Sequence, residues 1–71
     1  MLREPVSSSN LQSVGYDEFN NILEIEFNNN TIYQYYGVSP HIHNGLMNNP
    51  SHGTYFDRYI KNGGYRYKKI R

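Results

Sequence analysis

Leu23-Glu24-Ile25-Glu26-Phe27 is the stretch that decides the fold, because its apolar and charged side chains alternate without a break. Successive side chains of a β-strand point to opposite faces, so the three apolar residues are expected on one face and the glutamates on the other. The alternation predicts a half-buried antiparallel strand. We interpret Glu24 and Glu26 as its solvated side, with an acid/base catalytic pair as the alternative.

Turn-forming residues bound this strand on both sides. Residues 17–21 and 28–30 are rich in Asp and Asn, whose side chains satisfy the backbone of turns and tolerate left-handed geometry. Beyond the turns, residues 11–16 alternate imperfectly, and residues 31–36 are rich in β-branched and aromatic side chains. The sequence therefore predicts a three-stranded antiparallel meander.

The orientation of the third strand follows from its one amide side chain. Gln34 fits poorly in a core, so Tyr33 and Tyr35 are expected on the same face as Leu23 and Ile25. We interpret both tyrosines as core residues, with a stacking platform for a ligand as the alternative.

Two short helices are predicted after the meander. Ser39-Pro40 is typical of a helix start, and Asn48-Asn49-Pro50 ends that helix. Residues 54–61 place their apolar side chains on a single helical face, and Asn62-Gly63-Gly64 is a strong stop signal. The predicted class is therefore α+β, with a three-stranded antiparallel meander packed by two short helices.

The two ends of the chain carry less pattern. Residues 1–10 are polar and contain Pro5, and we expect an N-terminal arm or loop. Residues 65–71 form a basic C-terminal segment that is expected as an edge strand or a tail. We treat residues 1–71 as a single domain.

Size and composition narrow the function classes. A chain of 71 residues is near the lower limit for one unaided core, and a cleft with several supporting shells is hard to fit. There is no cysteine, which excludes a disulfide framework, a thiolate zinc site and a cysteine nucleophile. No apolar run approaches bilayer length or resembles a signal peptide. We expect a cytoplasmic protein without membrane contact, in which self-association as a homo-oligomer would bury further surface.

Charge is divided sharply along the chain. All six carboxylates lie at or before Asp57, whereas six of the seven cations lie after it. Tyrosines alternate with these cations in Tyr65-Arg66-Tyr67-Lys68. Cations attract phosphate and aromatic faces stack on bases, so this pattern indicates a nucleotide or RNA as partner. The alternative is a charged terminus whose tyrosines pack back on the domain.

Serine residues near the N-terminus are predicted to contribute to the same ligand-binding site as the basic C-terminal segment. Ser8 and Ser9 lie in an irregular serine run whose hydroxyls and amides can cradle phosphate, although a loop or cap is the alternative. Arginine grips phosphate with two bonds and stacks on a base. The predicted ligand-binding residues are Ser8, Ser9, Tyr55, Arg58, Tyr65, Arg66, Tyr67, Lys68 and Arg71.

Catalytic and metal sites are not predicted. His41 and His43 would diverge on a helix, and with His52 they lack any cysteine or carboxylate pair to complete a metal site. The serines lack a strand-turn-helix elbow and a third orienting group. We therefore expect no enzyme, no cofactor and no metal.

An ordered series of short motifs covers nearly the whole chain. It comprises Pro5-Val6-Ser7-Ser8-Ser9-Asn10, Val14-Gly15-Tyr16, Leu23-Glu24-Ile25-Glu26-Phe27, Tyr33-Gln34-Tyr35, Ser51-x-Gly53-x-Tyr55-Phe56, Ile60 and Tyr65-x-Tyr67-x-x-Ile70-Arg71. This series resembles the KTSC domain family, which is named for its occurrence at the C-terminus of some lysyl-tRNA synthetases and also occurs as small free-standing bacterial and phage proteins. The resemblance implies RNA binding, drawn from the synthetase context, and leaves room for small nucleotide signals. It supplies no catalytic residues.

The predicted function is a non-enzymatic binding module for a phosphate-bearing ligand. That ligand is either single-stranded RNA or a small nucleotide signal that the protein sequesters. A protein–protein interaction or self-assembly module is one alternative, and a small nucleotide-processing enzyme is the other.

Overall fold

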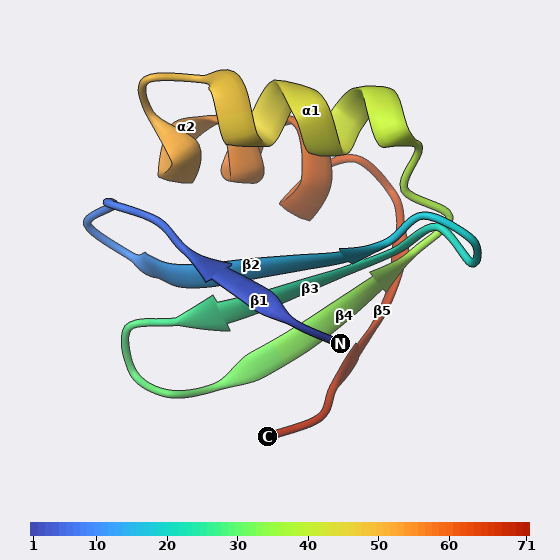
Figure 1. Cartoon of the computed structure of the whole chain (residues 1–71), viewed down its shortest axis with the longest axis horizontal. Coiled ribbons are helices and arrows are strands. Elements are labelled where there is room, and N and C mark those ends of the chain that lie inside the picture. The colour runs from blue at the N-terminus through green and yellow to red at the C-terminus, as the bar shows by residue number, and fades with distance from the viewer.

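The computed structural model describes all 71 residues as a five-stranded antiparallel sheet with helices on one side (Figure 1). The strands lie in the sheet in chain order. Their bounds are β1 Arg3–Pro5, β2 Leu11–Asp17, β3 Ile22–Phe27, β4 Ile32–Tyr36 and β5 Arg66–Lys69. The α1 helix spans Pro40–Asn48, α2 spans His52–Phe56, and the η1 π-helical turn spans Asp57–Lys61. The α+β class is confirmed.

The central strand β3 follows the predicted alternation. Leu23 and Ile25 are fully buried beneath the helices. In the register of β3 and β4, Leu23 pairs with Tyr35 and Ile25 pairs with Tyr33. Paired residues share a face of the sheet, so both tyrosines lie on the helix side. This confirms the orientation that was predicted because Gln34 fits poorly in a core.

The helices begin and end close to the predicted residues. The Ser39 hydroxyl accepts the backbone N–H of Ile42, and Pro40 opens α1. The helix predicted for residues 54–61 begins earlier, at His52, and its last turn widens into η1. Phe56 and Ile60 lie on one side of this continuous segment and are buried with Leu46 of α1.

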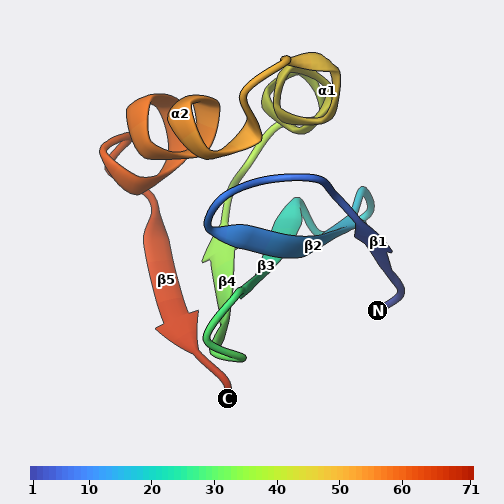
Figure 2. The ribbon, with the colours of Figure 1, turned by 90° about the vertical axis from the view of Figure 1, so that its left-hand side faces the viewer.

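The core therefore occupies the space between one sheet face and the helical layer. Figure 2 shows α1 and α2 above the sheet, with β1 and β5 at opposite edges. The buried cluster comprises Leu11, Val14, Leu23, Ile25, Tyr35, Val38, Leu46, Phe56 and Ile60. The opposite face of the sheet carries no helix (Figure 1).

The prediction of a three-stranded sheet is wrong by two edge strands. At one edge, Arg3 and Glu4, predicted to lie in a polar arm, pair with Gly15 and Val14 of β2. A side chain at Gly15 would crowd the backbone carbonyl of Leu2, so the missing Cβ admits β1. At the other edge β5 pairs with β4, which confirms the edge strand among the two forms considered for residues 65–71.

No helix of this structure is long and apolar enough to cross a membrane.

Candidate binding site

An open pocket lies on the helix-side face of β3, β4 and β5, between the turn that joins β3 to β4 and the segment from α2 to η1. Its volume is about 730 Å³, within the range of small-molecule sites. Aromatic side chains form its apolar part, namely Phe27, Tyr33, Tyr35, Phe56 and Tyr67. Polar side chains surround them, namely Ser9, Asn10, Asn28, Asn29, Thr31, Asp57, Lys61 and Asn62. We call this the aromatic pocket.

Three tyrosines from two adjacent strands line the pocket, and their exposure to solvent increases from the core outward. Tyr67 pairs with Tyr35 across β5 and β4, and Tyr33 lies two residues along the same face. Ring centroids are 5.7 Å apart for Tyr35 and Tyr67 and 6.0 Å apart for Tyr33 and Tyr67. Tyr35 is buried, whereas Tyr67 is 64% exposed. The inner ring is therefore fixed by packing, and the outer ring is accessible to a ligand.

Packing also fixes the chemical state of the inner tyrosine. Burial, followed by the neighbouring hydroxyls of Tyr33 and Tyr67 and the charge of Asp57, raises the pKa of Tyr35 to about 12. Its hydroxyl is therefore neutral at physiological pH and keeps a proton that it can donate.

The polar rim is held by the turn between β3 and β4. Asn28 donates its side-chain N–H to the Ser9 carbonyl at 2.9 Å and its backbone N–H to the Asn10 carbonyl at 3.0 Å. The Asn29 carboxamide oxygen accepts the Thr31 hydroxyl at 2.7 Å. These bonds join the serine loop to the turn, so one side of the pocket is built from two segments distant in sequence.

The opposite side of the rim comes from η1. Asn62 donates its side-chain N–H to the Asp57 carbonyl at 2.8 Å, which closes the last turn. Neither the Asp57 carboxylate nor the Lys61 ammonium takes part in an ion pair. Both charges therefore remain available to a ligand.

Of the nine predicted ligand-binding residues, the pocket brings together only Ser9 and Tyr67. Ser8 lines an adjacent polar groove and accepts the Leu11 backbone N–H at 3.3 Å. Tyr55 packs against Tyr59 with ring centroids 4.6 Å apart, outside the pocket. Tyr65 packs at the edge of the core.

The predicted cations are spread over different surfaces. Arg58 is exposed on η1. The β4–β5 register places Arg66 and Lys68 on the helix-free face, opposite Tyr36 and Gln34. Arg71 pairs with Glu26 at 3.2 Å. A single cationic cluster is therefore absent.

The core interpretation of Tyr35 is confirmed, because it is buried, whereas Tyr33 is half-buried; both rings also line the aromatic pocket, as the alternative of a stacking platform requires. The asparagines of residues 28–30 and Asn62 were used only as turn and stop signals. The available hint was the unusual density of amides beside aromatic strands. The alternation alone could not reveal that this face of the sheet stays partly open between η1 and the turn after β3.

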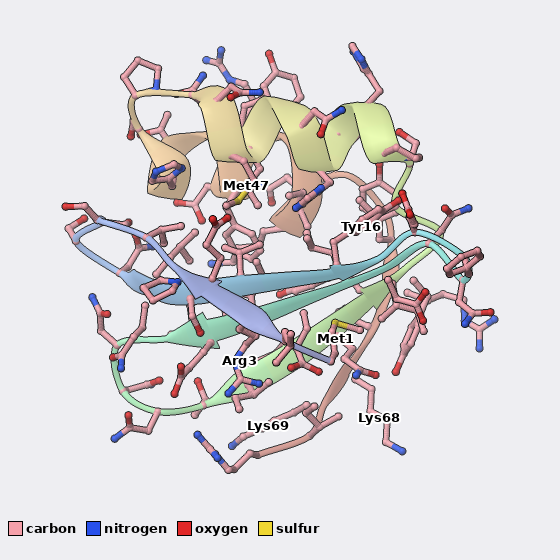
Figure 3. All side chains as sticks on the ribbon, in the orientation of Figure 1. Met1, Arg3, Tyr16, Met47, Lys68 and Lys69 are labelled. Atoms are coloured by element: carbon pink, nitrogen blue, oxygen red, sulfur yellow. The ribbon has the colours of Figure 1, made fainter.

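On the helix-free face, the interpretation of Glu24 as a solvated residue is wrong. Glu24 is only 5% exposed, because Arg3 reaches across from β1 and Gln34 approaches from β4. The Arg3 guanidinium lies 2.5 Å from one carboxylate oxygen, and the Gln34 amide lies 2.8 Å from the other. Figure 3 shows Arg3 lying beneath the sheet.

This network sets the charge state of Glu24. Burial opposes ionisation, but hydrogen bonds from Gln34 and Arg3, together with the Arg3 charge, outweigh it, so the pKa of Glu24 lies below its ordinary value. Glu24 is therefore an anion that joins β1, β3 and β4 on the helix-free face.

His43 and His52 have separate partners. His43 stacks on Tyr16 with ring centroids 4.4 Å apart, and the His52 Nδ1 lies 2.8 Å from the Leu46 carbonyl. The structure contains no group of three or more His, Cys, Asp or Glu side chains that could hold a metal ion.

Fold and pocket together define a small α+β domain with one aromatic pocket open to solvent. The family model that matches this chain is the KTSC domain, over residues 7–68. The chain belongs to the KTSC domain family.

Known relatives occur in two contexts. The chain is 39% identical over 70 residues to an uncharacterized protein of Stutzerimonas stutzeri (strain A1501), covering 99% of both. It is 31% identical over 60 residues to a lysine–tRNA ligase of Nostoc punctiforme, covering 84% of the chain but only 10% of the ligase. The crystal structure of a KTSC domain protein from Yersinia pestis is 43% identical, with a TM-score of 0.92 and coverage of 99% of this chain and 97% of that one.

Proposed function

We propose that the aromatic pocket binds a nucleobase of single-stranded RNA or of a small nucleotide, without catalysing a reaction. The observation that carries the proposal is the accessible Tyr67 ring beside Tyr33, above a fixed aromatic floor and inside an amide rim. Stacking of a base on an aromatic side chain contributes about 1–3 kcal/mol. The pocket thus supplies a stacking surface for the base of such a ligand.

The rim suits the edge of a base. Carboxamides such as Asn62 present both a donor and an acceptor, and base edges in single strands are recognised by such groups. The Asp57 carboxylate is an acceptor for an exocyclic amino group. These groups support recognition of a base rather than of an unfunctionalised aromatic ring.

Phosphate would lie on the β5 side of the pocket. Lys69 pairs with Tyr33 and is free of ion pairs, whereas the Asp57 carboxylate on the η1 side repels anions. The lysine–tRNA ligase relative carries a similar domain in a protein named for tRNA, which favours RNA. Capture of a small nucleotide signal, in a cytoplasmic setting, is the other form of the same chemistry.

The experiment is titration of the protein with fluorescein-labelled oligoadenylate and oligouridylate and with unlabelled cyclic and linear nucleotides, at two ionic strengths. Tyr67→Ala removes the outer stacking ring and is expected to weaken binding about 5- to 100-fold. Tyr59→Ala is the matched control, because Tyr59 is a partly exposed tyrosine that does not line the pocket.

The salt dependence separates the two ligand sources. Single-stranded RNA, with several phosphate contacts, is expected to lose affinity steeply with added salt, whereas a small nucleotide loses it shallowly. Equal affinities of the Tyr67→Ala and Tyr59→Ala variants, or no binding of any of these ligands, would refute the proposal.

A further inference from the structure

Strand β5 leaves a row of backbone groups unpaired. It is the last strand in the sheet, and all four of its residues, Arg66–Lys69, are exposed. Ile70 donates its N–H to the Ile32 carbonyl at 2.8 Å. In an antiparallel ladder the hydrogen-bonded pairs alternate, so Lys68 and Arg66 also face β4, whereas the backbone groups of Tyr67 and Lys69 point away from the sheet.

The two edges of the sheet are not equivalent. At the other edge, β1 is only three residues long and ends in Pro5, which has no N–H to donate. Short edge strands and edge prolines prevent pairing with a further strand. The β5 edge carries no proline, so it is the edge that can accept a strand.

The cationic side chains of β5 limit which strands can pair with its free edge. The cations Arg66, Lys68 and Lys69 take part in no ion pair, since all three ion pairs of the structure involve Arg3 or Arg71. Figure 3 shows Lys68 and Lys69 on the side of the molecule away from α1. Pairing of β5 with β5 of a second copy would place cations beside cations, which is unfavourable. An acidic strand would neutralise them.

We propose that the β5 edge docks an extended acidic segment of a partner protein as a sixth strand. The outward N–H and C=O groups of Tyr67 and Lys69 match those of a polypeptide strand and have no counterpart at that spacing in a nucleic acid. The three free cations then contact carboxylates on both faces of the added strand. This interaction uses the outer edge of β5, whereas base binding uses the aromatic pocket; the two proposals share the Lys69 side chain but not the Tyr67 ring.

The probe is a capped, fluorescein-labelled peptide of alternating Glu and Val, about six residues long, which is the usual length of a strand. Its control has the same sequence with N-methyl groups on alternate residues, which keeps the charge and removes one row of donors. The unmodified peptide is expected to bind at least about tenfold more tightly than its control, a difference of about 1.4 kcal/mol.

Two variants of one residue separate backbone pairing from charge. Lys69→Ala removes a cation and keeps the outward N–H, whereas Lys69→Pro removes both without breaking a hydrogen bond to β4. Lys69→Pro is expected to weaken peptide binding at least about fivefold more than Lys69→Ala. Thermal unfolding of both variants checks that each is folded, and the N-methylated peptide tests the wild-type protein independently of them.

Several outcomes would overturn the inference. Equal binding of the two peptides shows attraction by charge alone, and a dimer of the free protein that Lys69→Pro dissociates shows that a second copy occupies the edge. RNA that displaces the peptide, and whose binding weakens as much as that of the peptide in Arg66→Ala and Lys68→Ala, assigns the cations of the helix-free face to nucleic acid. Tyr67→Ala is expected to weaken binding of the nucleotide and to leave binding of the peptide unchanged. Failure of one proposal is therefore distinguishable from failure of the other.

Discussion

Replacing Arg3 with alanine tests whether a buried carboxylate on the open face depends on the N-terminal strand. Arg3 holds Glu24 through an ion pair at 2.5 Å, and the side chains are 25% and 6% exposed respectively. Loss of one partner of a fully buried pair costs about 3–5 kcal/mol, because the other charge stays unpaired. Arg3 is partly exposed and Gln34 still donates to Glu24, so we expect a loss of about 2–3 kcal/mol in the free energy of unfolding.

The loss is large for a domain of this size. For 60–100 residues, each kcal/mol shifts the melting temperature by about 4–8 °C, so Arg3→Ala is expected to melt about 10–20 °C lower. The assay is urea unfolding followed by tyrosine fluorescence and circular dichroism. Arg71→Ala is the matched control. The Arg71 side chain is 62% exposed, so its ion pair with Glu26 is expected to contribute less than about 1 kcal/mol to the free energy of unfolding.

The stability lost in Arg3→Ala is expected to depend on pH, because it depends on the charge of Glu24. In the wild-type protein the lowered pKa of Glu24 stabilises the fold above the ordinary value of 4.5, and this stabilisation is lost as the pH falls through the lowered pKa. In Arg3→Ala the hydrogen bond and the charge of the arginine are gone, so the pKa of Glu24 rises. The difference between the two proteins is therefore greatest at about pH 7 and shrinks toward about pH 4. A loss below about 0.5 kcal/mol, or one that does not change with pH, would refute this reasoning.

Three further substitutions, the first with a matched control, test the packing and the helix start. Phe56→Ala removes a ring that is 2% exposed and should lower the free energy of unfolding, measured in urea, by about 3–5 kcal/mol. Its control is Phe19→Ala, which removes a 92% exposed ring and should change that free energy by less than about 0.5 kcal/mol. Similar values for the two variants would contradict the assigned core. Gly45→Ala would drive a Cβ into the Tyr55 ring and should cost about 1–3 kcal/mol in the same assay, and a stabilised protein would show that this contact is not close. Ser39→Ala removes the cap of α1 and should cost about 1 kcal/mol, measured as a lower midpoint of thermal unfolding; no change would mean that the hydroxyl does not cap.

Much of the fold is readable from local pattern. The alternation of Leu23 to Phe27 specifies one strand and its buried face, and asparagines mark both adjoining turns, where Asn21 and Asn30 adopt positive φ. The edge strand β1 carries no such pattern, because it is three residues long and two of them, Glu4 and Pro5, are poor strand formers. It forms because β2 offers a free ladder and Gly15 leaves room beside it.

The candidate site was harder to predict than the fold. Aromatic and hydroxyl content predicts Tyr67 and Ser9 as ligand-binding residues; both line the aromatic pocket, and their contact with a ligand stays a prediction. The basic residues near the carboxyl end looked like one cluster in sequence. Alternation along β5 divides them, because neighbouring side chains of a strand point to opposite faces.

The sequence by itself determined the α+β class, the central meander, the helix boundaries near Ser39 and Asn62, and the kinship with KTSC domains. These features depend on interactions between residues a few positions apart, which side-chain order records directly. Only the tertiary structure decided the two edge strands, the burial of Glu24 and the joining of the serine loop, the asparagine turn and η1 around one aromatic pocket. Those features depend on backbone pairing and packing between distant segments, for which no local pattern in the chain is sufficient.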